Sequence, residues 1–338
     1  MMMVDEQTVF RVLLADELDP EGVAILEESE RLEVDARTDI DAAGLKAIIG
    51  KYDAVIVRSR TRLTAEILAG AERLKVIGRA GVGVDNIDID FAAGRGIVVL
   101  NVPAGNVISV AEHTLALILS MVRQIPQAQA SLARGEWRRK HFQGVELHGK
   151  TLGLAGAGRI GAEVAKRARA FGMRVIAYDP YLSDERAEQL GVELVTLSRL
   201  LEEADVVSVH TPLTEETRGM IGARQLALMK PDAYLVNAAR GGVVDEVALV
   251  EALQEGRLAG AALDVFEHEP LPADSPLLKL DNVVAVPHIG AATREAQVNV
   301  AVEISKAVRD ELVRISPNGA AASSFSRNAS GAALEKTS

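Results

Sequence analysis

The sequence lacks cysteine altogether, since none of its 338 residues is one. This absence excludes disulfide bonds, thiolate catalysis and cysteine-ligated metal sites, and we expect no bound metal. Positive charge is also scarce, with 37 Lys and Arg against 48 Asp and Glu. The resulting net charge of −11 argues against a general nucleic-acid-binding surface.

Long apolar runs are missing as well. No segment approaches the roughly 18 consecutive apolar residues of a transmembrane helix. Asp5 and Glu6 precede the first apolar run, which is not the pattern of a signal peptide. We therefore expect a cytoplasmic globular protein that does not bind a membrane.

The length and a hydrophobic fraction of 48% are typical of two globular domains. In the first part of the chain, short runs rich in β-branched residues alternate with helical patterns. The predicted strands are 10–15, 54–57, 74–77 and 97–100, and the predicted helices are 20–28, 41–50 and 64–69. This alternation predicts an α/β domain with its own parallel sheet.

A second series of strands and helices starts near residue 151. Its predicted strands are 151–155, 174–178, 206–209, 233–236, 261–263 and 283–286. Two long helical patterns, 107–133 and 292–313, flank the series. In the simplest architecture, the second domain is inserted into the first and the long helices form the two crossings.

A glycine-rich segment follows the first strand of the second series. Gly156, Gly158 and Gly161 fit G-x-G-x-x-G between that strand and a predicted helix. The first glycine permits a tight turn, the second a close approach to a pyrophosphate, and the third close packing of helix and strand. The helix start offers free N–H groups and a positive dipole end to phosphates. Because the next strand ends at the acidic Asp179, the segment predicts a dinucleotide site.

If the dinucleotide is a nicotinamide, hydride transfer at a carbonyl needs a matching proton, and histidine exchanges one near neutral pH. Of the six histidines, His288 follows the last predicted strand, at the edge of an open α/β sheet where ligands bind. His210 also ends a strand and is a candidate to touch the ligand. His113 lies in the first long helical pattern, where we expect a packing role.

Two other strand ends carry side chains suited to the same chemistry. Arg240 stands on a glycine-flanked loop, where a guanidinium can bind a carboxylate and stabilise charge on a carbonyl oxygen. A structural ion pair remains the alternative for this arginine. Asp264 and Glu269 follow the next strand, and a carboxylate close to His288 would favour its protonated form.

These segments, in this order, resemble the D-isomer-specific 2-hydroxyacid dehydrogenase family. The similarity runs from about residue 10 to 313, through 78–86, 101–106, 111–114, 156–161, 210–213, 237–242, 264–270 and 287–290. It implies an NAD-dependent D-2-hydroxyacid dehydrogenase.

The fold class that we predict is α/β, with two doubly wound parallel-sheet domains. A Rossmann NAD-binding domain, residues 105–295, is inserted into a flavodoxin-like substrate-binding domain, residues 1–104 and 296–317. Residues 318–338 are dominated by Gly, Ala, Ser and Asn without an apolar period, which predicts a disordered tail.

The resemblance also implies roles for single residues. Arg240 would orient and polarise the substrate, His288 would be the acid–base, and Glu269 its carboxylate partner. The implied NAD site consists of Gly156, Gly158, Arg159, Ile160, Gly161, Asp179, Thr211, Ala239, Asp264 and Gly290. Asp179 agrees with the physical argument, because a carboxylate accepts hydrogen bonds from ribose hydroxyls and repels a 2′-phosphate, which favours NAD over NADP.

Residues of the first domain bear on the choice of substrate. Arg58 and Arg60 bring two cations to the end of one predicted strand, with the hydroxyl of Ser59 between them, and Arg79 follows the next strand; such a cluster suits a phosphate. Donors for a substrate carboxylate would come from Gly81, Val82, Gly83 and Asn106. The alternative for each arginine is that it only solvates the surface.

Within the family, the chain looks most like the members that act on a phosphorylated acid. The implied reaction is oxidation of 3-phospho-D-glycerate to 3-phosphohydroxypyruvate, the first step of serine biosynthesis. One alternative is a glyoxylate or hydroxypyruvate reductase, or another D-2-hydroxyacid dehydrogenase. A second is a dinucleotide-sensing interaction protein, since some relatives act as corepressors.

The same resemblance implies a homodimer or homotetramer. An apolar helix face in 107–133, formed by Leu115, Leu117, Ile118 and Met121, could bury against a second copy. The alternative is that this face packs only on its own domain.

Overall fold

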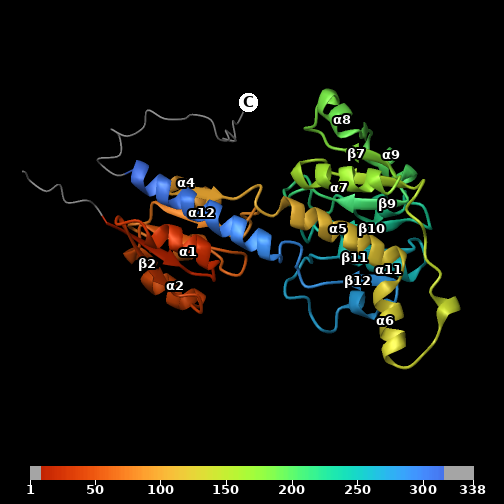
Figure 1. Ribbon diagram of the computed structural model, residues 1–338, viewed down its shortest axis with the longest axis horizontal. Coiled ribbons are helices and arrows are strands. Elements are labelled where there is room, and N and C mark those ends of the chain that lie inside the picture. The colour runs from red at the N-terminus through yellow and green to blue at the C-terminus, as the bar shows by residue number, and fades with distance from the viewer. Residues whose placement is uncertain (1–8, 316–338) are drawn as a thin grey trace, which may run out of the picture. The chain divides into compact units, whose positions relative to one another are not determined.

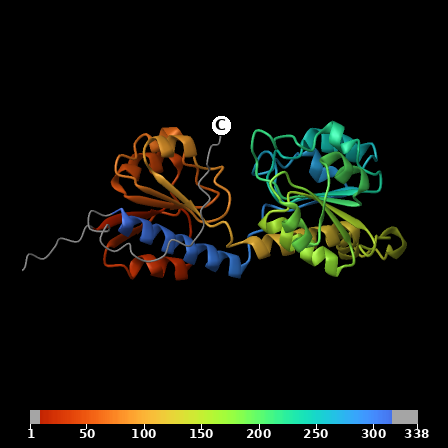
Figure 2. The same cartoon turned by 90° about the horizontal axis from the view of Figure 1, so that it is seen from above.

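The computed structural model describes residues 9–315. They form two compact units (Figures 1 and 2). Unit 1 holds the described residues up to Gly105 and from Gln297 onward, and unit 2 holds Asn106–Ala296. The tail predicted over 318–338 lies outside the described residues.

Unit 1 is built on a parallel sheet of five strands in the order β2-β1-β3-β4-β5. The strands are β1 (Phe10–Leu14), β2 (Leu32–Ala36), β3 (Ala54–Val57), β4 (Val76–Arg79) and β5 (Val98–Asn101). The helices are α1 (Pro20–Glu27), α2 (Ala42–Ile48), α3 (Ala65–Leu68), α4 (Ile89–Gly94) and most of α12 (Arg294–Arg314). A short 3-10 turn, η1 (Ile49–Lys51), follows α2.

Helices cover both faces of this sheet, as Figure 2 shows. Leu26 of α1 and Ile304 of α12 belong to the core on one face, and α2, α3 and α4 pack on the other. A side-chain carbon on Gly22 would lie 2.7 Å from Ala301, so α1 and α12 touch through their backbones. Because both faces are buried, the central strand β3 is apolar throughout.

Unit 2 is built on a parallel sheet of seven strands in the order β12-β11-β10-β9-β6-β7-β8. The strands are β6 (Thr151–Ala155), β7 (Arg174–Tyr178), β8 (Glu193–Leu194), β9 (Val206–Val209), β10 (Tyr234–Asn237), β11 (Gly260–Leu263) and β12 (Val283–Ala285). The order reverses between β6 and β9, and such a switch point is where doubly wound sheets bind ligands.

The helices of unit 2 also form two layers. They are α5 (Val107–Val122), α6 (Ile125–Ala133), α7 (Arg159–Ala170), α8 (Asp184–Leu190), α9 (Leu197–Glu203), α10 (Ala223–Leu226) and α11 (Glu246–Gln254), with 3-10 turns η2 (Arg139–His141) and η3 (Pro276–Lys279). Ile118 of α5 and Val164 of α7 share the core on one face. Leu200 of α9 and Leu249 of α11 share the core on the other.

The predicted fold class, two doubly wound parallel sheets, is confirmed by these two strand orders. Two edge strands, β2 and β8, were not predicted. Only Leu32 of the five residues of β2 is buried, and β8 has two residues, neither of them buried. Edge strands of this kind carry no apolar run from which a buried strand could be recognised.

The prediction of one helix over 107–133 is wrong. The segment forms α5 and α6, which meet at a bend of 61°. Gln124 between them has φ +51°, a left-handed conformation that interrupts a helix. Pro126 gives the reason, because in a continuous helix its ring would clash with the carbonyl four residues earlier.

The apolar face of α5 is buried in the core of unit 2 itself. Its members are Leu115, Leu117, Ile118 and Met121. This face therefore packs on its own domain and is not available to a second copy. Among residues 9–315, no single helix is long and apolar enough to span a membrane, and α5 and α6 together reach that length only across their bend.

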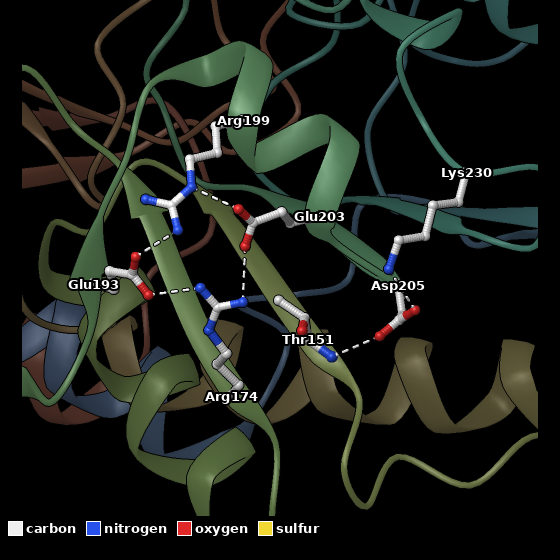
Figure 3. Close-up of polar contacts among 7 residues, drawn as sticks. All are labelled: Thr151, Arg174, Glu193, Arg199, Glu203, Asp205 and Lys230. Atoms are coloured by element: carbon white, nitrogen blue, oxygen red, sulfur yellow. Dashed lines mark hydrogen bonds and ion pairs between the residues drawn. The ribbon is translucent and has the colours of Figure 1, made fainter.

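A ring of charged side chains ties the amino ends of β7 and β8 to α9 (Figure 3). Arg174 donates to Glu193 at 2.6 Å and to Glu203 at 2.8 Å. Arg199 contacts the same two carboxylates, so that each carboxylate bridges both guanidinium groups. The hydrogen bonds from these arginines lower the pKa of both glutamates. The ring holds the short edge strand β8 against α9.

Candidate active site

The glycine-rich turn between β6 and α7 has the backbone geometry of a close-packed loop. Gly156 has φ +98°, and a Cβ on it would lie 2.8 Å from the carbonyl oxygen of His210. A Cβ on Gly161 would lie 2.5 Å from the carbonyl oxygen of Gly156, so strand and helix approach too closely for a side chain. A Cβ on Gly158, by contrast, would meet no described atom within 4 Å. The open side of the loop is thus at Gly158, where a phosphate could approach the start of α7.

Arg159 and Ile160 form the first turn of α7, directly after Gly158. Asp179 follows β7 and faces the same loop. One carboxylate oxygen of Asp179 accepts from the Ala157 N–H at 2.8 Å and the other from the Tyr181 N–H at 3.0 Å. These bonds orient the carboxylate and leave lone pairs for further donors, such as ribose hydroxyls.

The end of β9 brings two more polar side chains to the glycine loop. His210 bonds Ser208 through Nε2 at 2.9 Å, and burial lowers the pKa of His210 to about 4, so its imidazole is neutral. The Oγ1 atom of Thr211 is buried and has no hydrogen-bond partner among residues 9–315. A buried hydroxyl that lacks a partner is costly unless a ligand supplies one. Thr211 and the open side of Gly158 therefore fit a bound dinucleotide.

His288 lies in the turn that follows β12. Its backbone has φ +52°, a conformation that residues with a Cβ rarely adopt. The Nδ1 atom lies 2.8 Å from Oε2 of Glu269. The second oxygen of Glu269 accepts from the Phe266 N–H at 3.0 Å, which fixes the carboxylate toward the imidazole. Nδ1 is thereby engaged, and Nε2 is the nitrogen on the other side of the ring.

The charges around this pair set its protonation. The hydrogen bond to Glu269 raises the pKa of His288 against the opposing effect of burial; Asp264 raises it further and Arg240 lowers it. Burial raises the pKa of Glu269, but the hydrogen bonds from His288 and the Phe266 N–H outweigh burial, and the net pKa is lowered. An ionised Glu269 beside a histidine that binds protons more readily is a suitable acid–base pair.

Arg240 lies on the loop after β10, which Asn237 holds. The buried Asn237 amide donates to the Arg240 carbonyl at 2.9 Å and accepts from the Ala239 N–H at 3.1 Å. The guanidinium donates to the Ala239 carbonyl at 2.7 Å. A Cβ on Gly241 would lie 1.8 Å from the carbonyl oxygen of Phe266, so the Arg240 loop packs directly on the loop that carries Glu269.

Asp264, predicted to bind the cofactor, contacts the His288 turn. Its side chain is 1% exposed. One oxygen accepts from the Ile289 N–H at 2.7 Å and the other from the Gly290 N–H at 2.9 Å. Arg240, Glu269, His288, Asp264 and Gly290 are thus brought to one edge of the sheet of unit 2.

Helix α5 contributes two side chains to this edge that sequence analysis missed. Ser109 Oγ donates to the Gly290 carbonyl at 2.7 Å, and His113 Nε2 lies 3.2 Å from Oδ1 of Asp264. The only available signal was their spacing, because residues four apart lie on the same face of a helix.

In unit 1, the loops after β3 and β4 carry the residues predicted to bind substrate. The Asn86 amide joins these loops by donating to the carbonyls of Arg58 at 2.7 Å and Thr61 at 2.6 Å. Arg79 donates to the Ala80 carbonyl at 3.0 Å, and its guanidinium lies against Gly81, which has φ +148°.

The other residues predicted to bind substrate lie partly in unit 1 and partly in unit 2. Val82 accepts from the Asn101 amide at 2.6 Å, which fixes the loop that ends with Gly83. Asn106 belongs to unit 2, just before α5, and its buried Oδ1 has no hydrogen-bond partner among residues 9–315.

Arg58 and Arg60, the two arginines of the β3 loop that were predicted to bind substrate, differ. Asp16, 4% exposed, accepts from the Arg58 N–H at 2.6 Å and from Arg60 Nε at 2.8 Å. Arg60 also donates to the carbonyls of Ala15 and Thr38. The Arg58 guanidinium makes no hydrogen bond or ion pair within residues 9–315, and the neighbouring Ser59 is exposed. Of the two arginines, Arg58 is therefore the one available to a ligand.

Comparison with known proteins places unit 2 in a family. Residues 115–290 match the family model described as D-isomer specific 2-hydroxyacid dehydrogenase, NAD binding domain. The chain belongs to this family. The cofactor prediction is confirmed at the level of the domain: unit 2 carries the NAD-binding domain of the family.

Similarity to family members extends beyond unit 2. The chain is 53% identical over 296 residues to a D-3-phosphoglycerate dehydrogenase of Archaeoglobus fulgidus, covering 88% of this chain and 56% of that protein. It thus spans about half the length of the curated relatives that it matches.

Two solved structures of similar proteins span nearly the whole of their own chains. The TT0316 protein from Thermus thermophilus matches with a TM-score of 0.83 at 40% identity, and the match covers 89% of this chain and 96% of the TT0316 chain. A D-lactate dehydrogenase from Aquifex aeolicus, complexed with NAD and lactic acid, has a TM-score of 0.79 at 33% identity and covers 89% and 95%. The roles of single residues in the chain described here stay predictions.

Proposed function

We propose that this protein oxidises 3-phospho-D-glycerate to 3-phosphohydroxypyruvate with NAD, the first step of serine biosynthesis. The observation that carries the proposal is the 2.8 Å pair of His288 and Glu269 beside Arg240, on an NAD-binding domain of the family. Support for the substrate comes from the 53% identity to a relative named D-3-phosphoglycerate dehydrogenase.

In the oxidative direction, neutral His288 takes the proton of the C2 hydroxyl at Nε2 as the carbonyl forms. The hydride that leaves C2 would go to NAD, which the glycine loop at Gly158 and the carboxylate of Asp179 would hold. The ionised Glu269 stabilises the imidazolium that results, because an adjacent carboxylate favours the protonated ring. In the reverse direction the protonated ring returns its proton to the carbonyl oxygen.

Arg240 orients the substrate in this proposal. A guanidinium binds a carboxylate through two parallel hydrogen bonds, which fixes the acid in one orientation. Its charge also stabilises the developing carbonyl dipole. For the cofactor, we assign the phosphates to Gly158, Arg159 and Ile160, the ribose to Asp179, and further contacts to Thr211, Ala239, Asp264 and Gly290.

Unit 1 supplies recognition of the substrate's phosphate. We assign this role to Arg58, Ser59 and Arg79, with Arg60 in support because Asp16 and two carbonyls already engage its guanidinium. Gly81, Val82, Gly83 and Asn106 bind the carboxylate.

The deciding experiment compares kcat/KM for phosphohydroxypyruvate and hydroxypyruvate with NADH. We expect a preference for the phosphorylated acid, which Arg58→Ala lowers about 10-fold to 100-fold, the loss typical of a hydrogen bond to a charged group. Arg62→Ala is the matched control, since Arg62 is an exposed arginine of the same loop. A preference for hydroxypyruvate that Arg58→Ala leaves unchanged would favour a reductase of unphosphorylated acids. Tight NADH binding without turnover of any 2-oxo acid would favour a dinucleotide-sensing protein.

We also propose a homodimer or homotetramer in the cytoplasm. Because the apolar face of α5 is buried within unit 2, the support comes from the segment that follows it. Ile125, Leu132 and Trp137 are large apolar side chains there, and all three are exposed. Light scattering of the wild type and of a variant with Leu132→Glu and Trp137→Glu tests this proposal.

A further inference from the structure

The backbone of His288 is held in a conformation that it would not adopt by itself. A left-handed φ, here +52°, is sterically unfavourable for a residue with a Cβ, whose Cβ comes close to the following carbonyl oxygen. Such a conformation persists only where surrounding contacts enforce it. The contacts of the turn His288–Gly290 therefore decide where the imidazole lies.

The side chains of Asp264 and Ser109 grip this turn from two sides. Asp264 accepts from the N–H groups of Ile289 and Gly290, and Ser109 donates to the Gly290 carbonyl at 2.7 Å. Both side chains are buried. Gly290 is thus bonded through both groups of its backbone, through its N–H to Asp264, the residue after β11, and through its carbonyl to Ser109 of α5.

His113 closes the arrangement from α5. Its Nε2 is buried and lies 3.2 Å from Oδ1 of Asp264, within ion-pair range but without the alignment of a hydrogen bond. A Cβ on Gly290 would lie 2.9 Å from Oδ2 of Asp264 and 3.5 Å from Cδ2 of His113. The imidazole of His113 therefore packs against the turn while it faces the carboxylate that holds it.

We propose that Ser109 and His113 are positioning residues for His288. From one face of α5 they fix the turn 288–290 and thereby the alignment of the His288 imidazole with Glu269. They act on the proton-transfer step without touching the substrate. The inference rests on the proposed function only in taking His288 as the acid–base.

Release of the turn would change the pH at which His288 becomes protonated. The charged groups that face its ring are Glu269, Asp264 and Arg240. The bond to Glu269 is the strongest influence that raises the pKa of His288. If the turn is released, this bond lengthens, and the pKa of His288 falls toward its ordinary value near 6.5.

The test measures this titration directly, in the full chain and without substrate. The Cε1–H signal of His288, assigned through its loss in His288→Asn, is followed by NMR from acid to alkaline pH. The variants are Ser109→Ala, His113→Leu and the conservative His113→Gln. Thr114→Val is the matched control, because Thr114 is buried in the same helix and its hydroxyl, among residues 9–315, bonds only within that helix, to the Val110 carbonyl at 2.8 Å.

We expect Ser109→Ala and His113→Leu to lower the midpoint of the His288 titration, His113→Gln to lower it less, and Thr114→Val to leave it unchanged. In turnover, kcat should fall about 10-fold to 100-fold with little change in KM for NADH, the loss typical of residues that orient a reactive group. Unchanged midpoints in folded Ser109→Ala and His113→Leu would overturn the inference, and so would an equal shift in Thr114→Val. A wild type without turnover would refute the proposed function but would not affect the NMR result.

Discussion

Unit 1 and unit 2 each carry a buried aspartate just after a parallel strand, and each aspartate accepts a backbone N–H of the loop beside it. Asp16 in unit 1 also binds the side chain of Arg60, which engages that guanidinium. Asp264 in unit 2 accepts hydrogen bonds from the backbone N–H groups of the two residues after His288, whose side chain remains 41% exposed, and His113 contacts one of its oxygens at 3.2 Å. A buried carboxylate that binds a side chain, as Asp16 binds Arg60, leaves that side chain less able to bind a ligand. A buried carboxylate that binds the backbone, as Asp264 does, fixes the turn and leaves the neighbouring side chain of His288 able to react.

The largest effect is expected from removal of the His288 imidazole, whose turn Asp264 holds. His288→Ala should lower kcat about 10²-fold to 10⁴-fold, the usual contribution of a general acid–base, with NADH affinity nearly unchanged. Steady-state kinetics and a fluorescence titration with NADH measure both quantities. Arg60→Ala is the comparison in unit 1 and should change kcat far less. Near-normal turnover of His288→Ala would remove His288 from this role.

Asp264→Asn should damage the turn itself. An amide can accept only one of the two N–H bonds, so we expect the free energy of unfolding to fall by about 1–3 kcal/mol. Displacement of His288 should lower kcat about 100-fold. Urea unfolding and kinetics test the two effects, with the exposed Asp281→Asn as control. A stable variant with wild-type kcat would contradict the role of Asp264 in holding the turn.

Asp16→Asn should affect stability and binding rather than kcat. Loss of the carboxylate releases Arg60 and the Arg58 N–H, and about 1–3 kcal/mol of unfolding free energy is expected to go with them. KM for the phosphorylated acid should change while kcat stays within a few-fold of wild type. A double-mutant cycle with Arg60→Ala separates the loss of the ion pair from the loss of the loop. A fall in kcat as large as that of Asp264→Asn would erase the contrast between the two aspartates.

The pair of His288 and Glu269 in unit 2 should make both stability and activity depend on pH. The raised pKa of His288 adds stability that is present below about 6.5 and lost as pH rises through the folded value. The lowered pKa of Glu269 adds stability that is present above about 4.5 and lost as pH falls through the folded value. The pair should therefore stabilise most between these values, and only slightly, because both side chains are more than a third exposed.

Two measurements follow from this pair. In the oxidative direction, kcat/KM should rise with pH through the raised pKa of His288, and Glu269→Gln should move the midpoint down. The Tm difference between wild type and Glu269→Gln should be largest between pH 4.5 and 6.5, where both groups are charged. A Tm difference that does not depend on pH would show that the pair contributes no charge interaction.

The smallest effect is expected at the charged ring of β7, β8 and α9. Arg174→Gln breaks two ion pairs but leaves the turn of His288 untouched. We expect a slightly lower Tm, a difference that shrinks in high salt, and unchanged kcat, because exposed ion pairs are weak and screened. A change in kcat would show that this edge communicates with the site.

The fold was largely predictable because its signals are local. Each signal lies within one short stretch of sequence, as do the apolar runs of β3, β6 and β9 and the glycines at the start of α7. The break at Gln124 was not predicted, because the apolar pattern continues through it and only Pro126 marks it. The edge strands β2 and β8 were missed because neither carries an apolar run.

The candidate site was predictable in its members and not in their connections. Arg240, Glu269 and His288 follow strands of one parallel sheet, whose carboxyl ends meet at one edge. The part played by His113 could not be predicted, because a histidine in an apolar helix is equally typical of packing. Its contact with Asp264 depends on how α5 lies against the sheet.

The sequence by itself determined the α/β class, the dinucleotide motif and the strand-end residues that could carry the chemistry, because periodicity and spacing are properties of neighbouring residues. Only the tertiary structure decided which of those side chains are bound by other parts of the protein and which are available to a ligand. Arg60 is bound by an aspartate 44 residues away, and Gly290 by a serine 181 residues away. Such contacts depend on packing between distant segments.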